Sequence, residues 1–299
     1  MTSVANNPRL SLLDKPFEIC IFSVGEFTMK GLFATRNISK GELIIAEKPL
    51  FICRGEFSAA FNKLAPADKE LFMSYTDVYA NSDATKTVDG IGRTNSLPLG
   101  DRSDSAGFFP ICSLFNHSCR PNVVHRFHTK QFVEKFHAVT DIAEGEQLCT
   151  AYTDVHRDLR DRLQLFRSRF NFICACDFCT FLQKNTPAQS ESDENRSLLW
   201  VLDQNFPNLI YKADKAVELT EHRIKLMETE GLDYLKSSAY YDAFQICIAY
   251  QRLLGRAKEY IKKAFDVAVL HYGADSDLAE KYQKFFMNPR SHQNFGLLG

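Results

Sequence analysis

Residues 116–122 read Asn-His-Ser-Cys-Arg-Pro-Asn. Two further stretches follow it: Gly-Glu-Gln-Leu-Cys-Thr-Ala-Tyr at 145–152 and Cys-Ala-Cys-Asp-Phe-Cys at 174–179. A fourth stretch, Lys-Gly-Leu-Phe-Ala-Thr-Arg at 30–36, lies well before them. Each of these four stretches combines turn residues with side chains that can bind a metal or a ligand or take part in catalysis.

The cysteine-rich stretch predicts a metal site. Cys174, Cys176 and Cys179 offer three thiolates within six positions, and tetrahedral zinc needs one more ligand from elsewhere. The strongest outside candidate is Cys119, because it lies in the polar, turn-like run 116–122 and not in an apolar stretch. We therefore expect one structural zinc ion held by these four cysteines. Four thiolates leave no open position on the metal, which argues against a zinc-dependent hydrolase.

The remaining cysteines have a plainer interpretation. They sit inside hydrophobic patterns, where a free cysteine usually acts as a small core residue: Cys20, Cys53, Cys112, Cys149 and Cys247. His117 and His125 stay open as alternative metal ligands, although a lone histidine is more often satisfied by a backbone group.

Composition excludes several classes of protein. The chain has 299 residues, 45% hydrophobic and 24% charged, as in a soluble globular protein with one large or two medium cores. Lys plus Arg is 36 and Asp plus Glu is 37, so no basic arm indicates nucleic-acid binding. The longest apolar runs are far below the ~18 residues of a membrane span, and the N-terminus has no apolar signal core. We expect a cytoplasmic or nuclear protein with no membrane partner and with reduced cysteines.

Two regions are predicted to form a mainly β core. Short apolar and β-branched runs separated by turn residues indicate antiparallel strands. The predicted strands are Phe17–Val24, Leu32–Arg36, Leu43–Glu47, Asn122–His128, Gln131–Val139 and Gln147–Tyr152. Between the two regions, Phe57–Tyr79 predicts a small helical insert, and Asn81–Gly107 predicts a loop with a strand near Ile91.

The rest of the chain is predicted to be helical. An amphipathic helix at His156–Phe170 buries its apolar stripe, and its outward face is predicted to carry Arg157, Arg160, Arg162, Arg167 and Arg169. Gln183–Arg196 predicts a solvated linker. Helices then follow, broken at Gly231, Gly255 and Gly273: Ala213–Glu230, Ser237–Leu254, Arg256–His271 and Ser276–Phe286. A plain helical bundle is favoured over tetratricopeptide repeats, which only two loose matches support.

The four ordered motifs resemble those of the SET-domain protein lysine methyltransferases. A cysteine within the Asn-His-Ser-Cys motif, the later cysteine trio and a helical C-terminal region are similar to the SET-and-MYND (SMYD) subfamily. In that group a MYND zinc module follows the strand equivalent to Pro49–Cys53. Here the chain passes straight into the helical insert without a Cys/His array, so this looks like a relative without MYND.

The resemblance implies an α+β fold in several parts. A SET fold of small antiparallel sheets with a pseudoknot would span residues 1–167, with its helical insert at about 55–95. A zinc-binding post-SET segment would follow at 168–182, then a linker at 183–196 and an all-α C-terminal domain at 197–299. The single Gly-x-Gly, at 90–92, lacks the third glycine of a dinucleotide fingerprint and supports no Rossmann domain.

The resemblance also implies S-adenosylmethionine as the methyl donor. Backbone groups of Lys30, Gly31 and Leu32 would contact it, and Gly31 would allow close approach. Asn116 and His117 would hold its amino acid and adenine portions, and Phe172 would stack on the adenine. Asn95 and Ser113 match further positions on the cofactor side.

In the same way, Tyr152 matches the tyrosine of the family's lysine channel. Its hydroxyl would orient the amine, and the channel would favour the neutral amine through desolvation. Phe170 stands where many relatives have a second channel tyrosine. Thr150, two residues before Tyr152, replaces a residue that is aromatic in many SET enzymes, which predicts room for further methylation.

The predicted activity is therefore transfer of a methyl group to a lysine of a protein substrate, histone or other, by a monomeric enzyme. The alternative is a SET module without activity that binds a protein partner. The joint presence of Asn116, His117 and Tyr152 argues for the enzyme, because a binding module does not need the channel tyrosine.

Overall fold

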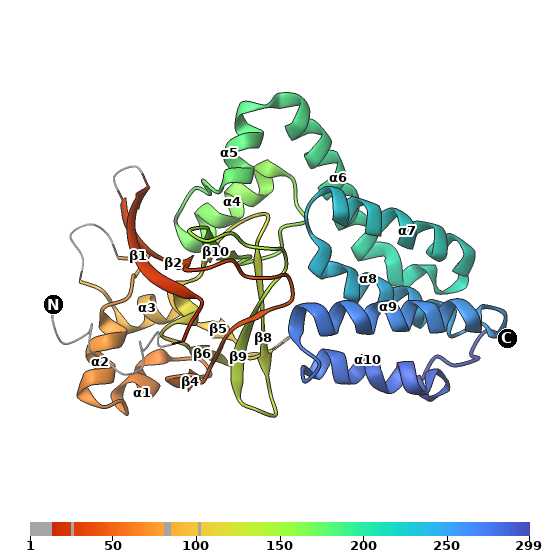
Figure 1. Ribbon diagram of the computed structural model, residues 1–299, viewed down its shortest axis with the longest axis horizontal. Helices are drawn as coiled ribbons and strands as arrows, with labels where there is room; N and C mark the ends of the chain where they lie inside the picture. The colour runs from red at the N-terminus through yellow and green to blue at the C-terminus, as the bar shows by residue number, and fades with distance from the viewer. Residues whose placement is uncertain (1–13, 25–26, 81–84, 101–102) are drawn as a thin grey trace. The chain divides into compact units, whose positions relative to one another are not determined.

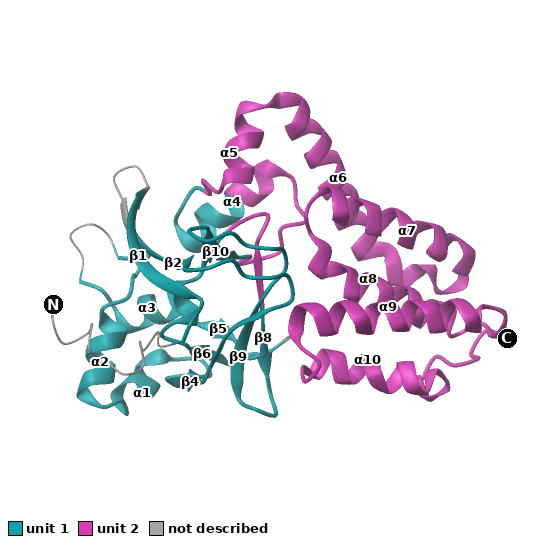
Figure 2. Ribbon diagram, viewed as in Figure 1, with its two compact units in different colours: residues 1–117, 125–150, 164–173 teal, residues 118–124, 151–163, 174–299 magenta. Residues whose placement is uncertain are grey.

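The computed structural model describes residues 14–24, 27–80, 85–100 and 103–299 (Figure 1). Its contacts divide the chain into two compact units (Figure 2). Unit 1 consists of residues 1–117, 125–150 and 164–173, and unit 2 of residues 118–124, 151–163 and 174–299. This division differs from the predicted boundary near residue 167, because segments 118–124 and 151–163 group with the C-terminal helices.

Three small sheets form the β structure, in the orders β1-β2-β10-β7, β3-β9-β8 and β4-β6-β5. The strands are β1 (Phe17–Val24), β2 (Phe27–Ala34), β3 (Leu43–Glu47), β4 (Phe51–Cys53), β5 (Leu97–Pro98), β6 (Ala106–Phe108), β7 (Asn116–His117), β8 (Val123–His128), β9 (Val133–Ala138) and β10 (Gln147–Thr150). The ranges predicted for β1 and β3 are confirmed to the residue, and the other predicted strands shift by up to five positions. The short strands β5, β6 and β7 were not predicted, since they lie in segments that the sequence assigns to loop or turn. The prediction of purely antiparallel sheets is wrong for β10 and β7, which pair in parallel.

Aromatic and aliphatic side chains fill the core of unit 1. Leu32 of β2 and Leu148 of β10 face each other in the ladder and are fully buried. Phe115 stacks on Phe136 of β9 with ring centroids 4.1 Å apart, and Phe17 meets the Phe115 ring edge-on. Burial of such rings is the main driving force for folding, and their geometry fixes how the small sheets pack.

The predicted helical insert is present and more extensive than its pattern indicated. It contains α1 (Phe57–Asn62), α2 (Pro66–Met73) and α3 (Val88–Asn95). The strand predicted near Ile91 is wrong, because the segment forms α3 with the Thr87 side chain as its N-cap. Two glycines weaken the helical signal there, but the fully buried Ile91 anchors the helix. Parts of the predicted loop, 81–84 and 101–102, lie outside the described residues.

Helices make up most of unit 2, and α4 supplies residues to both units. They are α4 (Leu159–Phe170), α5 (Asp177–Lys184), α6 (Thr186–Asn205), α7 (Ala213–Thr229), α8 (Lys236–Cys247), α9 (Leu254–Tyr272) and α10 (Asp277–Met287). Short 3₁₀ turns lie at Cys112–Leu114, Phe206–Tyr211, Asp233–Leu235, Gln251–Leu253 and Pro289–Ser291. Successive helices pack together from α7 to α10. Small buried residues at their interfaces, such as Ala257 and Ala264 of α9, allow close approach.

Two predictions for this region are wrong. The predicted linker 183–196 is helical, because Asn185 caps α6 and the polar residues Ser192 and Arg196 are buried with partners. Gly255 does not break the helices, since it lies near the start of α9 while α8 ends at Cys247. One glycine costs a helix about 1 kcal/mol, which tertiary packing can offset.

Among the residues that the structure describes, no helix is both long enough and apolar enough to cross a membrane.

Candidate functional site

Three sequence-distant strands meet at Gly31 in unit 1. Leu148 of β10 pairs with Leu32 of β2, and the next residues of β10, Cys149 and Thr150, pair with Asn116 and His117 of β7. The Asn116 side-chain Nδ2 donates a hydrogen bond of 2.9 Å to the Lys30 carbonyl oxygen. The sheet thus brings together the motifs at 30–36, 116–122 and 145–152.

Gly31 is required for this close approach. A Cβ atom at this position would lie 2.6 Å from Nε2 of Gln147, 2.7 Å from Nδ2 of Asn116 and 2.9 Å from Cε1 of Phe22. Any side chain would therefore displace Asn116 from the Lys30 carbonyl. Glycine therefore allows the Asn116 side chain to approach the backbone of β2, where the predicted donor contacts lie.

Aromatic rings gather around His117 in the same unit. Its imidazole centroid lies 4.2 Å from that of Phe166 and 6.4 Å from that of Phe172. Phe172 stacks on Phe166 at 5.3 Å, and Phe170 lies 6.3 Å from Phe172. Phe166 is fully buried, whereas Phe170 and Phe172 are half-buried. The predicted stacking residue Phe172 and the predicted channel residue Phe170 therefore share one aromatic group with His117, which can accept a planar ring.

Asn95 and Ser113 also lie together, but their contacts are structural. The Ser113 hydroxyl donates to the Asn95 carbonyl oxygen over 2.7 Å. Asn95 Nδ2 in turn donates to the carbonyl oxygens of Thr76 and Ile91. These bonds fix the end of α3 against the 3₁₀ turn that precedes Asn116.

The two residues predicted near the methyl acceptor differ in their surroundings. Thr150 is the last residue of β10 and is 3% exposed, opposite His117 in the ladder. Tyr152 lies in unit 2, and its side chain is 36% exposed.

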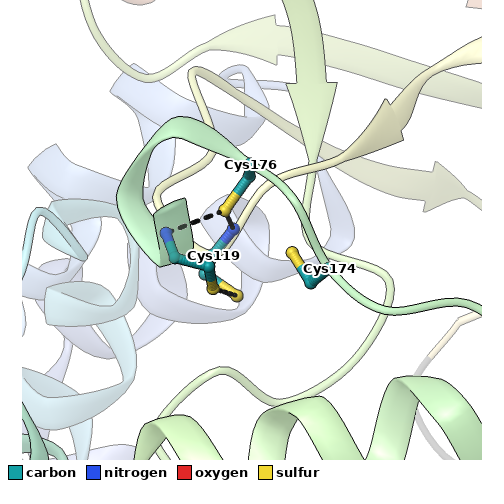
Figure 3. Close-up of side chains that lie close together, drawn as sticks. Cys119, Cys174 and Cys176 are labelled. Atoms are coloured by element: carbon teal, nitrogen blue, oxygen red, sulfur yellow. Dashed lines mark hydrogen bonds between the residues drawn. The ribbon is translucent and has the colours of Figure 1, made fainter. Parts of the chain in front are cut away.

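The four predicted zinc ligands form a cluster within unit 2. The sulfur atoms of Cys119, Cys174, Cys176 and Cys179 all lie within 4.8 Å of one another. Figure 3 shows side chains of this cluster directed toward a common space. The Cys176 sulfur accepts hydrogen bonds of 3.5 Å from the backbone N–H groups of Cys119 and Cys179, the second at the start of α5. Neither alternative ligand, His117 or His125, belongs to this cluster.

The spacing of the sulfur atoms fits a tetrahedral metal ion. Zn–S bonds of about 2.3 Å place tetrahedral sulfur atoms about 3.8 Å apart. The Cys119 and Cys179 sulfur atoms are 3.5 Å apart, and all four fall within the range that such a site needs. Hydrogen bonds from the Cys119 and Cys174 side chains lower the pKa of the Cys176 thiol, so a thiolate ligand is favoured there.

A group of buried charged side chains lies beside the cysteines, and the sequence pattern does not predict it. Arg162, predicted on the outward face of α4, is fully buried, as are Arg196 of α6 and the Glu230 side chain that follows α7. The sequence does contain a signal that Arg162 is buried. This residue lies three positions after Leu159 and four before Phe166, on the apolar stripe of the helix. Arg196 and Glu230 belong to no motif and could be found only from the structure.

Comparison with known proteins identifies one domain family. Residues 29–153 match the family model described as SET domain. The histone-lysine N-methyltransferase set5 of Schizosaccharomyces pombe is 29% identical over 282 residues, covering 93% of this chain and 87% of that protein. The N-lysine methyltransferase SMYD2 of Homo sapiens is 35% identical over 145 residues, 44% of this chain and 33% of that protein. The protein-lysine N-trimethyltransferase SMYD5 of Danio rerio is 32% identical over 112 residues, 36% and 27% of the two chains.

The names of these relatives agree with the resemblance that the motifs show. The share of each relative's length that the chain covers differs. The chain spans most of set5 but about a third or less of the SMYD proteins. Among solved structures, the SET domain of LSMT bound to lysine and AdoHcy aligns over 93% of this chain and 88% of that chain. Its 13% identity and TM-score of 0.35 are too low to bear on the fold. Residues 29–153 of the chain match the SET domain family, and the chain is similar to the lysine methyltransferases of the SMYD group.

Proposed function

We propose that the protein transfers a methyl group from S-adenosylmethionine to the side-chain amine of a lysine in a protein substrate. The observation that carries this proposal is the junction at Gly31, where Asn116 donates to the Lys30 carbonyl and no side chain fits between them. Similarity to proteins named lysine methyltransferases supports the same chemistry.

The residues of unit 1 have defined roles in holding the donor. The backbone of Lys30, Gly31 and Leu32 contacts it, and Asn116 and His117 bind its amino acid and adenine portions. Phe172 stacks on the adenine beside the His117 ring, 6.4 Å away. Asn95 and Ser113 support the turn before Asn116 through the bond that joins them. Bound in this way, S-adenosylmethionine supplies a methyl group on a sulfonium centre.

Other residues act on the substrate lysine. The Tyr152 hydroxyl orients the amine, and Phe170 and Thr150 line its path. A lysine amine with a pKa near ~10.4 must lose its proton before it attacks, and aromatic walls favour the neutral form by desolvation. Alignment of amine and methyl then supplies most of the acceleration, without a dedicated carboxylate base.

We predict that Tyr152→Phe lowers methyl transfer by orders of magnitude and changes cofactor affinity little. The substitution keeps the aromatic ring and removes the hydroxyl alone. The assay incubates the protein with cell extract and labelled S-adenosylmethionine and maps methylated lysines by mass spectrometry. Tyr211→Phe, at a tyrosine that is 77% exposed, is the matched control and should keep full activity. Lack of cofactor binding and methylation by the wild-type protein would instead support a SET module that only binds a partner.

We also propose that the protein contains one structural zinc ion held by Cys119, Cys174, Cys176 and Cys179. Cys119 follows His117 by two residues, and Cys174 follows Phe172 by two. A metal that joins Cys119 to Cys174 therefore restrains both segments that hold the donor.

Removal of this zinc should abolish binding of S-adenosylmethionine. Elemental analysis should give one zinc per chain, and calorimetry should detect no cofactor binding after chelation. Cys174→Ser should lower the zinc content, whereas Cys247→Ala, at a buried cysteine outside the cluster, should keep it. Wild-type protein without stoichiometric zinc, or full cofactor affinity after chelation, would contradict the proposal.

The size of Thr150 should determine how many methyl groups are added. Threonine is much smaller than the aromatic residue of many SET enzymes, so a methylated amine has room to realign. We expect di- or trimethyl-lysine from the wild-type enzyme and a shift toward monomethyl-lysine in Thr150→Tyr.

Product mass spectra at long reaction times decide this prediction. Thr150→Val keeps the size of the side chain and removes its hydroxyl, so it should retain the wild-type product. Monomethyl-lysine alone from the wild-type enzyme would show that another group closes the channel, for example a water held by the Thr150 hydroxyl.

A further inference from the structure

We propose that Arg162 donates hydrogen bonds to the metal-bound thiolates of Cys119 and Cys179, and that Arg162, Arg196 and Arg120 balance the charge of the metal centre. This inference rests on the proposed zinc site. All of the residues involved belong to unit 2, so the geometry lies within one compact unit.

Arg162 has buried donors that the protein's oxygen atoms do not satisfy. Its side chain is fully buried, and Nη1 donates to the Arg157 carbonyl oxygen. Nε and Nη2 are also buried, and they have no hydrogen-bond partner among the described residues. Buried guanidinium donors without a partner are costly, so an anionic acceptor is expected beside them.

The Cys119 and Cys179 thiolates are the acceptors that the surroundings of Arg162 provide. The Arg162 guanidinium carbon lies 5.7 Å from the centre of the Phe178 ring, and Phe178 directly precedes Cys179 in the chain. Metal-bound thiolates commonly accept such hydrogen bonds, and these bonds adjust the affinity of the site.

The charge of a zinc tetrathiolate would match the charges around the cysteines. Four thiolates and one Zn²⁺ carry two negative charges in excess. Arg120, Arg162 and Arg196 carry three positive charges, and Glu230, 2.7 Å from Arg196, offsets one of them. Two positive charges therefore remain, equal and opposite to those of the zinc tetrathiolate.

The three arginines gather around one aromatic ring, Phe178. Their guanidinium carbons lie 3.8 Å (Arg120), 4.7 Å (Arg196) and 5.7 Å (Arg162) from the centre of the Phe178 ring. Burial lowers the pKa of Arg196, and the charge of Arg162 lowers it further. Cation–π contacts with one ring compensate this repulsion only in part.

Arg196 also links the metal centre to the C-terminal helices. Its Nη2 donates to the Cys119 carbonyl oxygen over 3.2 Å, and its Nη1 donates to the Val155 carbonyl oxygen. Glu230 accepts from Arg196, Ser192 and Asn195, which ties α6 to the residue after α7. One guanidinium thus joins the loop that bears Cys119, the segment after Tyr152 and the helical domain.

The test is the zinc affinity of the full-length protein, measured by competition with a chromophoric chelator. Arg162→Met replaces the arginine side chain by another unbranched side chain that has no charge and no hydrogen-bond donors. Loss of a partner outside the ligand shell usually weakens metal binding by about 10–100-fold, and we expect a loss in this range. Arg160→Met, at an exposed arginine of the same helix, is the matched control and should bind zinc as the wild type does. Arg162→Lys keeps the charge but not the fork of donors, so its loss should be smaller than that of Arg162→Met.

The outcomes separate this inference from the zinc site on which it rests. Wild-type protein that holds no zinc overturns the site itself. Wild-type protein that holds zinc, with the same affinity in Arg162→Met, overturns the role of Arg162 and leaves the site standing. If circular dichroism shows that Arg162→Met does not fold, Arg162→Lys decides: weaker zinc binding supports the inference, and wild-type affinity overturns it.

Discussion

The hydrogen bond from Asn116 to the Lys30 carbonyl, made beside a glycine whose Cβ would lie 2.7 Å from Asn116 Nδ2, is the contact on which the arrangement of unit 1 depends. It joins β2 to β7, which are separated by the helical insert and by β3 to β6 in the chain. Because β10 lies between them in the sheet, the same contact fixes Thr150 opposite His117. The donor site proposed here is thus a consequence of how three distant strands approach at one residue.

The second constraint is electrostatic and belongs to unit 2. Four cysteines, three arginines and one buried carboxylate lie together, and two of the arginines, Arg162 and Arg196, are fully buried. The proposed metal tetrathiolate, with two negative charges, would balance the two positive charges that remain after the carboxylate is counted. The helical C-terminal region therefore does more than follow the SET domain in the chain, since Arg196 and Glu230 of this region contact the backbone or the neighbours of Cys119.

Much of the fold and of the candidate site could be predicted from the sequence. The predictions that were wrong have physical causes. The apolar, β-branched run at Phe17–Val24 and the spacing of Cys174, Cys176 and Cys179 are local signals, and both correspond to the structure. The motifs identified Gly31, Asn116 and Phe172, but not the contacts that join them. Arg162 was misplaced because a charge was assumed to face solvent, although its helical position is on the apolar stripe. Helix α6 was missed because its polar residues are buried through long-range partners that no local pattern shows.

The most direct test of the account is calorimetric titration of S-adenosylmethionine into the wild-type protein and into Gly31→Ala. We expect one binding site per wild-type chain. In Gly31→Ala we expect at least a tenfold loss of affinity, about 1.4 kcal/mol, because the added methyl group displaces Asn116. Gly255→Ala, where a Cβ meets nothing within 4 Å, should bind as the wild type does. Failure of the wild-type protein to bind the cofactor, or unchanged affinity in a folded Gly31→Ala protein, would contradict it.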